Sequence, residues 1–110
     1  MKRESIMTND LEHCIVCDSP RVEIHHIFGG ANRNNSDRFG LFVPLCHRHH
    51  NEPPEGVHFD KGFRLSLQAK AQARFETVNS HEDFMRIFGA DYIEKYKAYI
   101  REAVNQGQED

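Results

Sequence analysis

Three cysteines and several histidines stand out as residues that could bind metal ions. Cys14 and Cys17 are separated by two residues, and Cys46 and His49 repeat that spacing about thirty residues later. Structural Zn²⁺ takes four thiolate or imidazole ligands in a tetrahedron, and two such pairs can converge on one ion from two directions. The spacing therefore predicts a structural zinc site built from Cys14, Cys17, Cys46 and His49.

The fourth ligand has a neighbour of the same type. His50 follows His49, and residues three and four positions after Cys46 project from nearly the same face of a helix. The spacing favours His49 as the fourth ligand, and His50 remains the alternative. Disulfides inside one chain do not explain the cysteines, because three thiols leave one unpaired.

Two adjacent histidines, His25 and His26, form the second feature. They lie in an alternating segment, 21–28, that two glycines close, which is typical of a strand ending in a turn. Neighbouring residues on a strand point to opposite faces, so we expect the two imidazoles to do different jobs. One could bind a divalent cation while the other accepts a proton from water. A core histidine bonded to the backbone is the alternative for either ring.

The surrounding pattern predicts the elements that hold these residues. Residues 31–40 are rich in Asn, Arg, Ser and Gly and predict a loop, and the apolar run 41–45 predicts a brief edge strand that pairs back on the first. Residues 46–51 then open a short helix that two prolines end. We expect the polar residues 1–12 to form a loose lead-in.

The second half of the chain has a helical pattern. Apolar spacing predicts a helix of about four turns from Lys61, another between a Ser80 cap and Gly89, and a last helix capped by Asp91. Together with the predicted hairpin, these helices indicate an α+β fold.

Length and composition limit the architecture and the location. A chain of 110 residues suits one domain, 1–110, with a motif core at 14–59 and a helical extension at 60–105. With 38% apolar and 28% charged residues the core is thin, so a bound ion would help to hold it. No apolar run approaches the roughly 18 residues that span a bilayer, so export and membrane anchoring are disfavoured and we expect a cytoplasmic protein.

The net charge of −3 hides an uneven distribution. Residues 19–75 carry eight Lys and Arg against five Asp and Glu, so the only net-positive segment contains most of the histidines. A local positive field attracts a phosphate backbone whatever the total charge. The candidate phosphate contacts are Arg33, Arg38, Arg48, Lys61 and Arg64, followed by Lys70 and Arg74.

Together, these residues resemble the HNH endonuclease family in its zinc-stabilised form with a ββα-metal motif. The resemblance rests on the Cys-x-x-Cys pair, on His25-His26-Ile27 followed by two glycines, and on Leu45-Cys46-x-x-His49-His50-Asn51. It includes the small HNH proteins of phages and prophages, in which a segment like Gly56-Val57-His58-Phe59 and a helical tail also follow. The implied fold is a treble-clef-like, zinc-bound hairpin and helix followed by two or three helices.

The resemblance assigns roles by position. His26 falls at the general base that deprotonates the attacking water, and His25 and His50 fall at ligands of a catalytic divalent metal, Mg²⁺, Mn²⁺ or another ion. The four residues of the Cys/His pairs fall at the structural zinc positions. His58 is an extra metal ligand or a support. The implied activity is hydrolysis of phosphodiester bonds in DNA.

One position departs from the family pattern. Alignment on Leu45 and Cys46 places Leu41 where the family commonly carries Asn, and an alkyl side chain can neither orient a base nor hold a metal. The nearby residues that could substitute are Asn32, Asn34, Asn35 and Asn51.

The resemblance leaves several properties open. Its implied partner is DNA, double-stranded or single-stranded, and the chain could act as a monomer or a homodimer. The alternative function is a noncatalytic zinc module that binds nucleic acid. Such a module would share the zinc ligands but has no use for His25, His26 and His50 together.

Overall fold

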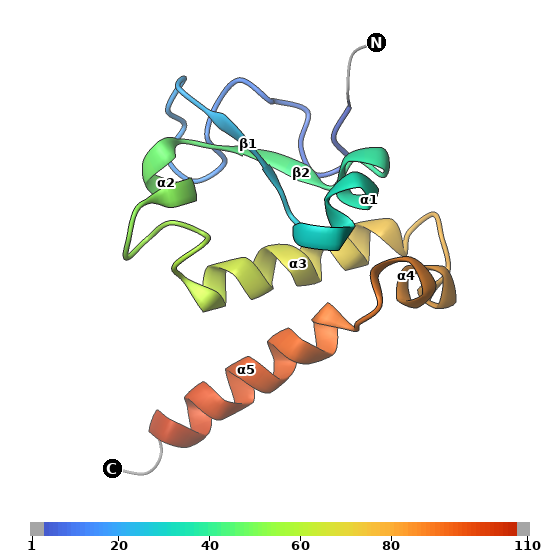
Figure 1. Ribbon diagram of the computed structural model, residues 1–110. Helices are drawn as coiled ribbons and strands as arrows, with labels where there is room; N and C mark the ends of the chain where they lie inside the picture. Colours follow the sequence, from blue (N-terminus) through green and yellow to red (C-terminus); the bar gives the residue numbers. More distant parts are fainter. Residues whose placement is uncertain (1–3, 108–110) are drawn as a thin grey trace.

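The computed structural model describes residues 4–107, which form a two-stranded hairpin, a short helix after each strand, and three longer helices (Figure 1). In chain order the elements are β1 (Glu23–His26), the 3₁₀ turn η1 (Gly30–Asn32), α1 (Arg33–Arg38), β2 (Phe42–Leu45), α2 (His47–Asn51), α3 (Lys61–Phe75), α4 (His81–Phe88) and α5 (Tyr92–Gly107). The predicted α+β class, with a hairpin and helix followed by C-terminal helices, is confirmed.

β1 and β2 pair antiparallel, with His25 opposite Val43 and His26 opposite Phe42. All four residues of β2 are buried, whereas β1 buries His25 and leaves Ile24 exposed. The two neighbouring histidines therefore leave β1 on opposite sides, as the strand geometry predicts.

The prediction of a loop over residues 31–40 is wrong, because this segment contains η1 and α1. Its Asn- and Ser-rich sequence carries no apolar period, so the helix depends on tertiary contacts. The fully buried Ser36 accepts a hydrogen bond from the Phe28 backbone N–H at 3.2 Å, and the Leu41 N–H donates to the Ser36 carbonyl at 2.8 Å. Gly40, with a φ of 72°, then turns the chain into β2.

The short helix α2 follows β2 directly and begins after Cys46, as predicted. Glu52 leaves the helix in an extended conformation, since the residue before a proline is pushed away from helical angles. The turn that carries Cys14 and Cys17 packs beside this junction, because the Ile15 N–H donates to the Pro44 carbonyl at 3.1 Å. Both cysteine-bearing segments thus meet at one end of β2.

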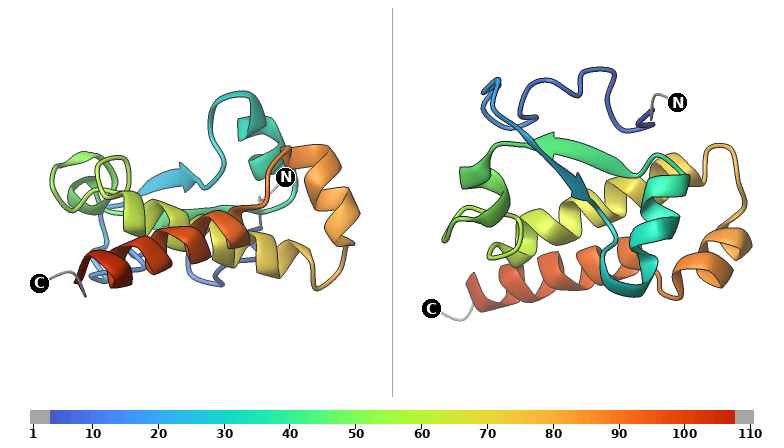
Figure 2. Two further views of the ribbon diagram at one scale, coloured as in Figure 1. Left: turned by 90° about the horizontal axis from the view of Figure 1, so that it is seen from below. Right: turned by 45° about the horizontal axis from the view of Figure 1, so that its top comes forward.

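The three long helices are close to their predicted bounds. Asp60 accepts a hydrogen bond from the Phe63 N–H at 3.0 Å and caps α3, and Ser80 accepts from the Asp83 N–H at 3.0 Å and caps α4. Gly89, with a φ of 84°, ends α4. α5 lies alongside α3 and runs in the opposite direction, with α4 joining them at one end (Figure 1 and Figure 2).

A core of phenylalanines joins the helices to the hairpin. Phe28 follows β1 and contacts Phe88 of α4 with ring centroids 4.7 Å apart, while Phe75 of α3 lies 5.5 Å from Phe84. All four rings are buried. Aromatic packing of this kind fixes the end of β1, and with it the strand that carries the adjacent histidines.

The first described residues are hydrogen-bonded to the hairpin, whereas the sequence predicts a loose lead-in. Ser5 Oγ donates to the Phe42 carbonyl at 2.7 Å, and the Ile6 N–H donates to the Gly40 carbonyl at 2.9 Å. Residues 1–3 of this prediction lie outside the described part. Over residues 4–107, no helix combines the length and apolarity needed to cross a bilayer.

Candidate metal centres

The structure brings Cys14, Cys17, Cys46 and His49 together at the junction of the cysteine turn with α2. Cys17 Sγ lies 3.6 Å from Cys46 Sγ, and His49 Nδ1 lies 3.2 Å from Cys46 Sγ and 3.8 Å from Cys14 Sγ. A tetrahedron with Zn–S bonds of about 2.3 Å has edges of about 3.8 Å. The donor set and its spacing therefore fit a Zn²⁺ ion, and the cluster is a candidate zinc site.

The backbone around this cluster prepares one thiol for ligation. Burial acts to raise the pKa of Cys14, but backbone hydrogen bonds from Cys46, Cys17 and Val16 outweigh it and lower that pKa to about 6. The Val16 N–H, for example, lies 3.4 Å from Cys14 Sγ. A thiolate is the form that binds metal, so the cysteine turn favours the ligating state before an ion arrives.

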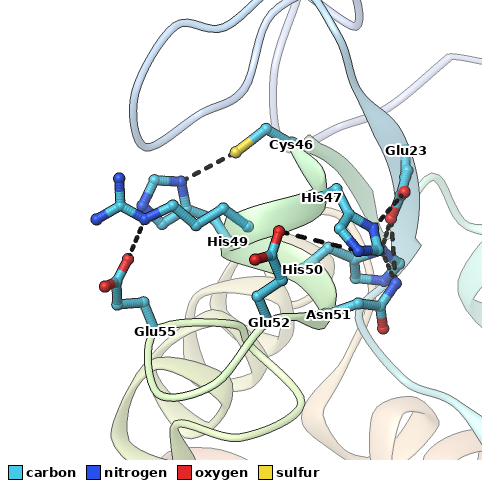
Figure 3. Close-up of polar contacts among 9 residues, drawn as sticks. Glu23, Cys46, His47, His49, His50, Asn51, Glu52 and Glu55 are labelled. Atoms are coloured by element: carbon cyan, nitrogen blue, oxygen red, sulfur yellow. Dashed lines mark hydrogen bonds and ion pairs between the residues drawn. The ribbon is translucent and has the colours of Figure 1, made fainter.

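α2 separates the two histidines between which spacing alone could not choose. His49 points toward Cys46, whereas His50 points to the other side, toward Glu23 of β1 (Figure 3). His49 therefore belongs to the cysteine cluster and His50 to a second group.

The second group consists of His25, His50 and His58, with one ring nitrogen of each within 4.8 Å of the others. The ring centroids are 4.9 to 5.2 Å apart, and the Nε2 atoms of His50 and His58 are separated by 3.2 Å. Three imidazoles that converge in this way form a candidate site for a divalent ion.

His25 is the most informative member of this group. Its ring is buried, and its Nε2 has no hydrogen-bond partner among the described residues. Burial, reinforced by His50, His58 and His26, lowers the pKa of His25 to about 3, so the ring is neutral. A buried neutral nitrogen without a partner is costly unless a water or an ion uses its lone pair.

Glu23 orients the second member, and sequence reasoning missed it. Its carboxylate accepts hydrogen bonds from His50 Nδ1 at 2.7 Å and from His47 Nδ1 at 2.9 Å, and these bonds lower the pKa of Glu23 (Figure 3). Because a carboxylate only accepts, the neutral His50 ring carries its proton on Nδ1 and turns the Nε2 lone pair toward His58. The sequence signal that could have identified Glu23 is its position two residues before His25, on the same face of β1.

His58 enters the group through a tight turn after α2. Gly56 makes this turn possible, since a Cβ there would lie 2.7 Å from the Glu52 carbonyl oxygen. The Arg64 guanidinium then lies 3.3 Å from the Val57 carbonyl and 3.5 Å from that of His58. The structure thus places His58 with the other two histidines, and the Arg64 guanidinium lies beside them.

His26 lies apart from the three converging rings. It leaves the opposite side of β1, and its Nε2 is 3.2 Å from Asp37 Oδ1 of α1. The adjacent histidines thus have separate surroundings: His25 faces two imidazoles, and His26 faces a carboxylate.

The asparagines differ in their distance from the histidine group. Asn51 Nδ2 lies 3.1 Å from both Glu23 Oε1 and His50 Nδ1, whereas Asn32 donates to the Phe88 carbonyl. Leu41, at the position where the family commonly carries Asn, is fully buried. Of the asparagines considered, Asn51 is the one brought to the histidine group.

The basic residues do not form one tight patch. Arg64 lies beside the histidine group, whereas Arg48 forms an ion pair with Glu55. The Arg38 guanidinium stands over the Phe39 ring. The remaining candidates are exposed: Arg33, Lys61, Lys70 and Arg74.

Comparison with known proteins adds no family to these observations. No family model, curated protein or solved structure matches the chain. The functional interpretation therefore rests on the residues and their geometry.

Proposed function

We propose that this protein is a metal-dependent endonuclease of the HNH type, which hydrolyses phosphodiester bonds in DNA. The observation that carries the proposal is the buried His25 Nε2, which has no hydrogen-bond partner within residues 4–107 and lies beside the rings of His50 and His58. A purely structural zinc module has no use for this second convergence of donors. His25 directly precedes His26, and it is the resemblance of this His-His pair to the HNH motif that assigns the general base.

The two candidate centres take different parts in this proposal. The Cys3His cluster would hold Zn²⁺ with all four positions filled by protein, which suits a structural role. The three histidines would hold a second divalent ion, which when bound supplies positive charge against the anionic oxygens of a phosphodiester. Three protein ligands leave positions at which substrate or water can bind.

The chain's own residues supply the remaining steps. His26 accepts the proton of the attacking water and so raises its nucleophilicity, which is typically worth about 10² to 10⁴ in rate. Arg64, beside His58, contributes a fixed positive charge near the substrate phosphate. Glu23 holds His50 in the tautomer that can ligate.

The donor set limits the choice of ion. All three side chains offer imidazole nitrogen, which binds Mn²⁺, Ni²⁺ and Zn²⁺ more tightly than Mg²⁺. We therefore propose that Mn²⁺ or a similar ion supports activity at lower concentrations than Mg²⁺ does.

DNA is the proposed substrate because the histidine group lies within the net-positive part of the chain. Arg64, Lys61 and Arg33 are the basic residues proposed to contact the phosphate backbone. Contacts of this kind recognise phosphates rather than bases, so DNA affinity should fall steeply with salt and vary little with sequence.

The test is nicking of supercoiled plasmid by zinc-loaded protein in the presence of Mn²⁺. We expect His26→Ala to lower the rate by about 10² to 10⁴ with zinc content unchanged. His81→Ala is the matched control, because His81 is an exposed histidine paired with Glu76 in a different part of the molecule. Nicking by His26→Ala at the wild-type rate would refute the assignment.

The same experiment tests the alternative, a noncatalytic zinc module that binds nucleic acid. If the wild-type protein retains zinc and binds DNA but nicks no plasmid with Mn²⁺ or Mg²⁺, the endonuclease proposal fails and the module is favoured.

A further inference from the structure

The ring proposed as the base has a carboxylate beside it. Asp37 Oδ1 lies 3.2 Å from His26 Nε2, and the two side chains come from α1 and β1. The His26 side chain is 13% exposed and that of Asp37 is 38% exposed, so the pair lies near the protein surface. Phe42 of β2, with its ring centroid 6.1 Å from that of His26, is a second neighbour of this ring.

The hydrogen-bonding capacity of the pair determines which nitrogen of His26 can act. A carboxylate only accepts, so the neutral ring carries its proton on Nε2 and keeps the Nδ1 lone pair. Within residues 4–107, the side-chain hydrogen bond of His26 is the one from Nε2 to Asp37. Nδ1 is then the nitrogen that can take a proton from water.

We propose that Asp37 is a positioning residue for the reaction, which fixes the orientation and the tautomer of the His26 ring. This inference rests on the proposed function, since it concerns the base of that reaction. Sequence reasoning missed Asp37 because it lies eleven residues beyond His26 in a segment with no apolar period.

A purely structural role for Asp37 is the competing explanation, in which the pair ties α1 to β1. Ser36 already provides that tie through its bonds to the Phe28 N–H and to Leu41, and it is fully buried. Loss of the more exposed Asp37 carboxylate should therefore leave the fold intact. The positioning role predicts that the loss in rate caused by Asp37→Ala disappears when His26 is absent.

A double-mutant cycle in the plasmid-nicking assay tests this proposal. We expect Asp37→Ala to lower kcat about 10- to 100-fold, with zinc content and the KM for plasmid unchanged. Asp37→Asn should lose less, because its amide oxygen can still accept from Nε2. In the His26→Ala background, Asp37→Ala should have no further effect.

Two controls separate positioning from structure. Glu76→Ala removes the carboxylate of another carboxylate–histidine pair, that of His81, and should nick at the wild-type rate. If Asp37→Ala nicks at the wild-type rate, or lowers the residual rate of His26→Ala by the same factor as in the wild type, the proposal is overturned.

The tautomer of His26 provides a readout that does not depend on nuclease activity. Two-bond ¹H–¹⁵N correlation spectra should report the Nε2–H form in the wild type and a mixture of both forms in Asp37→Ala. An Nδ1–H form in the wild type would overturn the proposal even where nicking is observed. If the wild type nicks no DNA but the tautomers behave as expected, the proposed function fails while the orienting role of Asp37 stands.

Discussion

The two sides of α2 carry donor clusters that differ in composition and in surroundings. On one side, Cys46 and His49 complete a set of four donors, enough to fill a tetrahedral ion. On the other side, His50 joins only two further imidazoles, and the carboxylate of Glu23 holds its second ring nitrogen. Adjacent residues of one short helix thus belong to two candidate metal sites, one with four donors and one with three.

The position of α2 between the two clusters predicts that one cluster depends on the other but not the reverse. α2 has five residues, and an isolated helix of this length is unstable in water. Ligation of Cys46 and His49 would hold α2 in place, and α2 in turn presents His50. The histidine group should therefore depend on the cysteine cluster, whereas the cysteine cluster should not depend on the histidine group.

The largest expected effect is that of Cys46→Ser. Structural zinc contributes an apparent binding free energy of about 10 to 16 kcal/mol in small domains, which is comparable with or larger than the whole stability of a domain. We expect loss of zinc, of the cooperative unfolding transition and of Mn²⁺ binding, as measured by elemental analysis, circular dichroism and calorimetry.

The exposed His47 of the same helix supplies the control for this variant. His47→Ala should keep its zinc, because this ring contacts Glu23 rather than the cysteine cluster. A folded, cooperative Cys46→Ser protein without zinc would show that the cysteine cluster has no structural role.

A smaller and more selective effect is expected for Glu23→Gln. Removal of a group that holds the second nitrogen of a ligating histidine typically costs about 10- to 100-fold in metal affinity. Calorimetric titration with Mn²⁺ should detect this loss at the histidine group while the zinc content stays at one ion per chain. An equal loss of zinc and Mn²⁺ would contradict the separation of the two clusters.

The depressed pKa of His25 predicts a pH dependence of stability. Its pKa is about 3 in the folded chain against an ordinary value of 6.5, mainly because of burial. Between these values the unfolded chain binds the extra proton, so this contribution to stability is full above about pH 6.5 and is lost as the pH falls toward about 3.

Denaturant unfolding of the protein without added Mn²⁺, from about pH 7 to about pH 5.5, measures this effect. His25→Leu should show a smaller decrease in the free energy of unfolding over this range than the wild type. Equal slopes for the two proteins would mean that His25 does not remain neutral in the folded chain.

The smallest effect is expected far from both clusters. Ser80 caps α4, and Ser80→Ala should lower the free energy of unfolding by about 1 kcal/mol. Zinc content and Mn²⁺ affinity should stay at wild-type values. A change in either would mean that α4 communicates with the clusters, which their separation from α4 does not predict.

The features predicted from the sequence that recur in the structure have local signals. The Cys/His spacing and the caps at Ser80 and Gly89 act within a few residues, so each could be recognised without knowledge of the fold. The choice between His49 and His50 needed the direction of α2 relative to β1, which only the assembled hairpin supplies.

The features that sequence reasoning missed depend on distant partners. α1 is held by the buried Ser36 rather than by an apolar face, so its sequence reads as a loop. Gln72 is fully buried in α3 and accepts hydrogen bonds from the N–H groups of Tyr92 and Ile93, which anchors α5.

The two carboxylates beside the histidines were missed for a similar reason. Glu23 and Asp37 each contact a histidine that lies on a different element. Each of these polar residues looks like an ordinary surface residue until its partner is in place.

The most direct test of two separate ion sites is anomalous diffraction from crystals of the zinc-loaded protein soaked in Mn²⁺. Data collected on both sides of the zinc edge and at a wavelength sensitive to manganese identify each ion by its own signal. We predict zinc among Cys14, Cys17, Cys46 and His49, and manganese among the rings of His25, His50 and His58. A zinc peak with no second ion at the three imidazoles, even in excess Mn²⁺, would contradict the account.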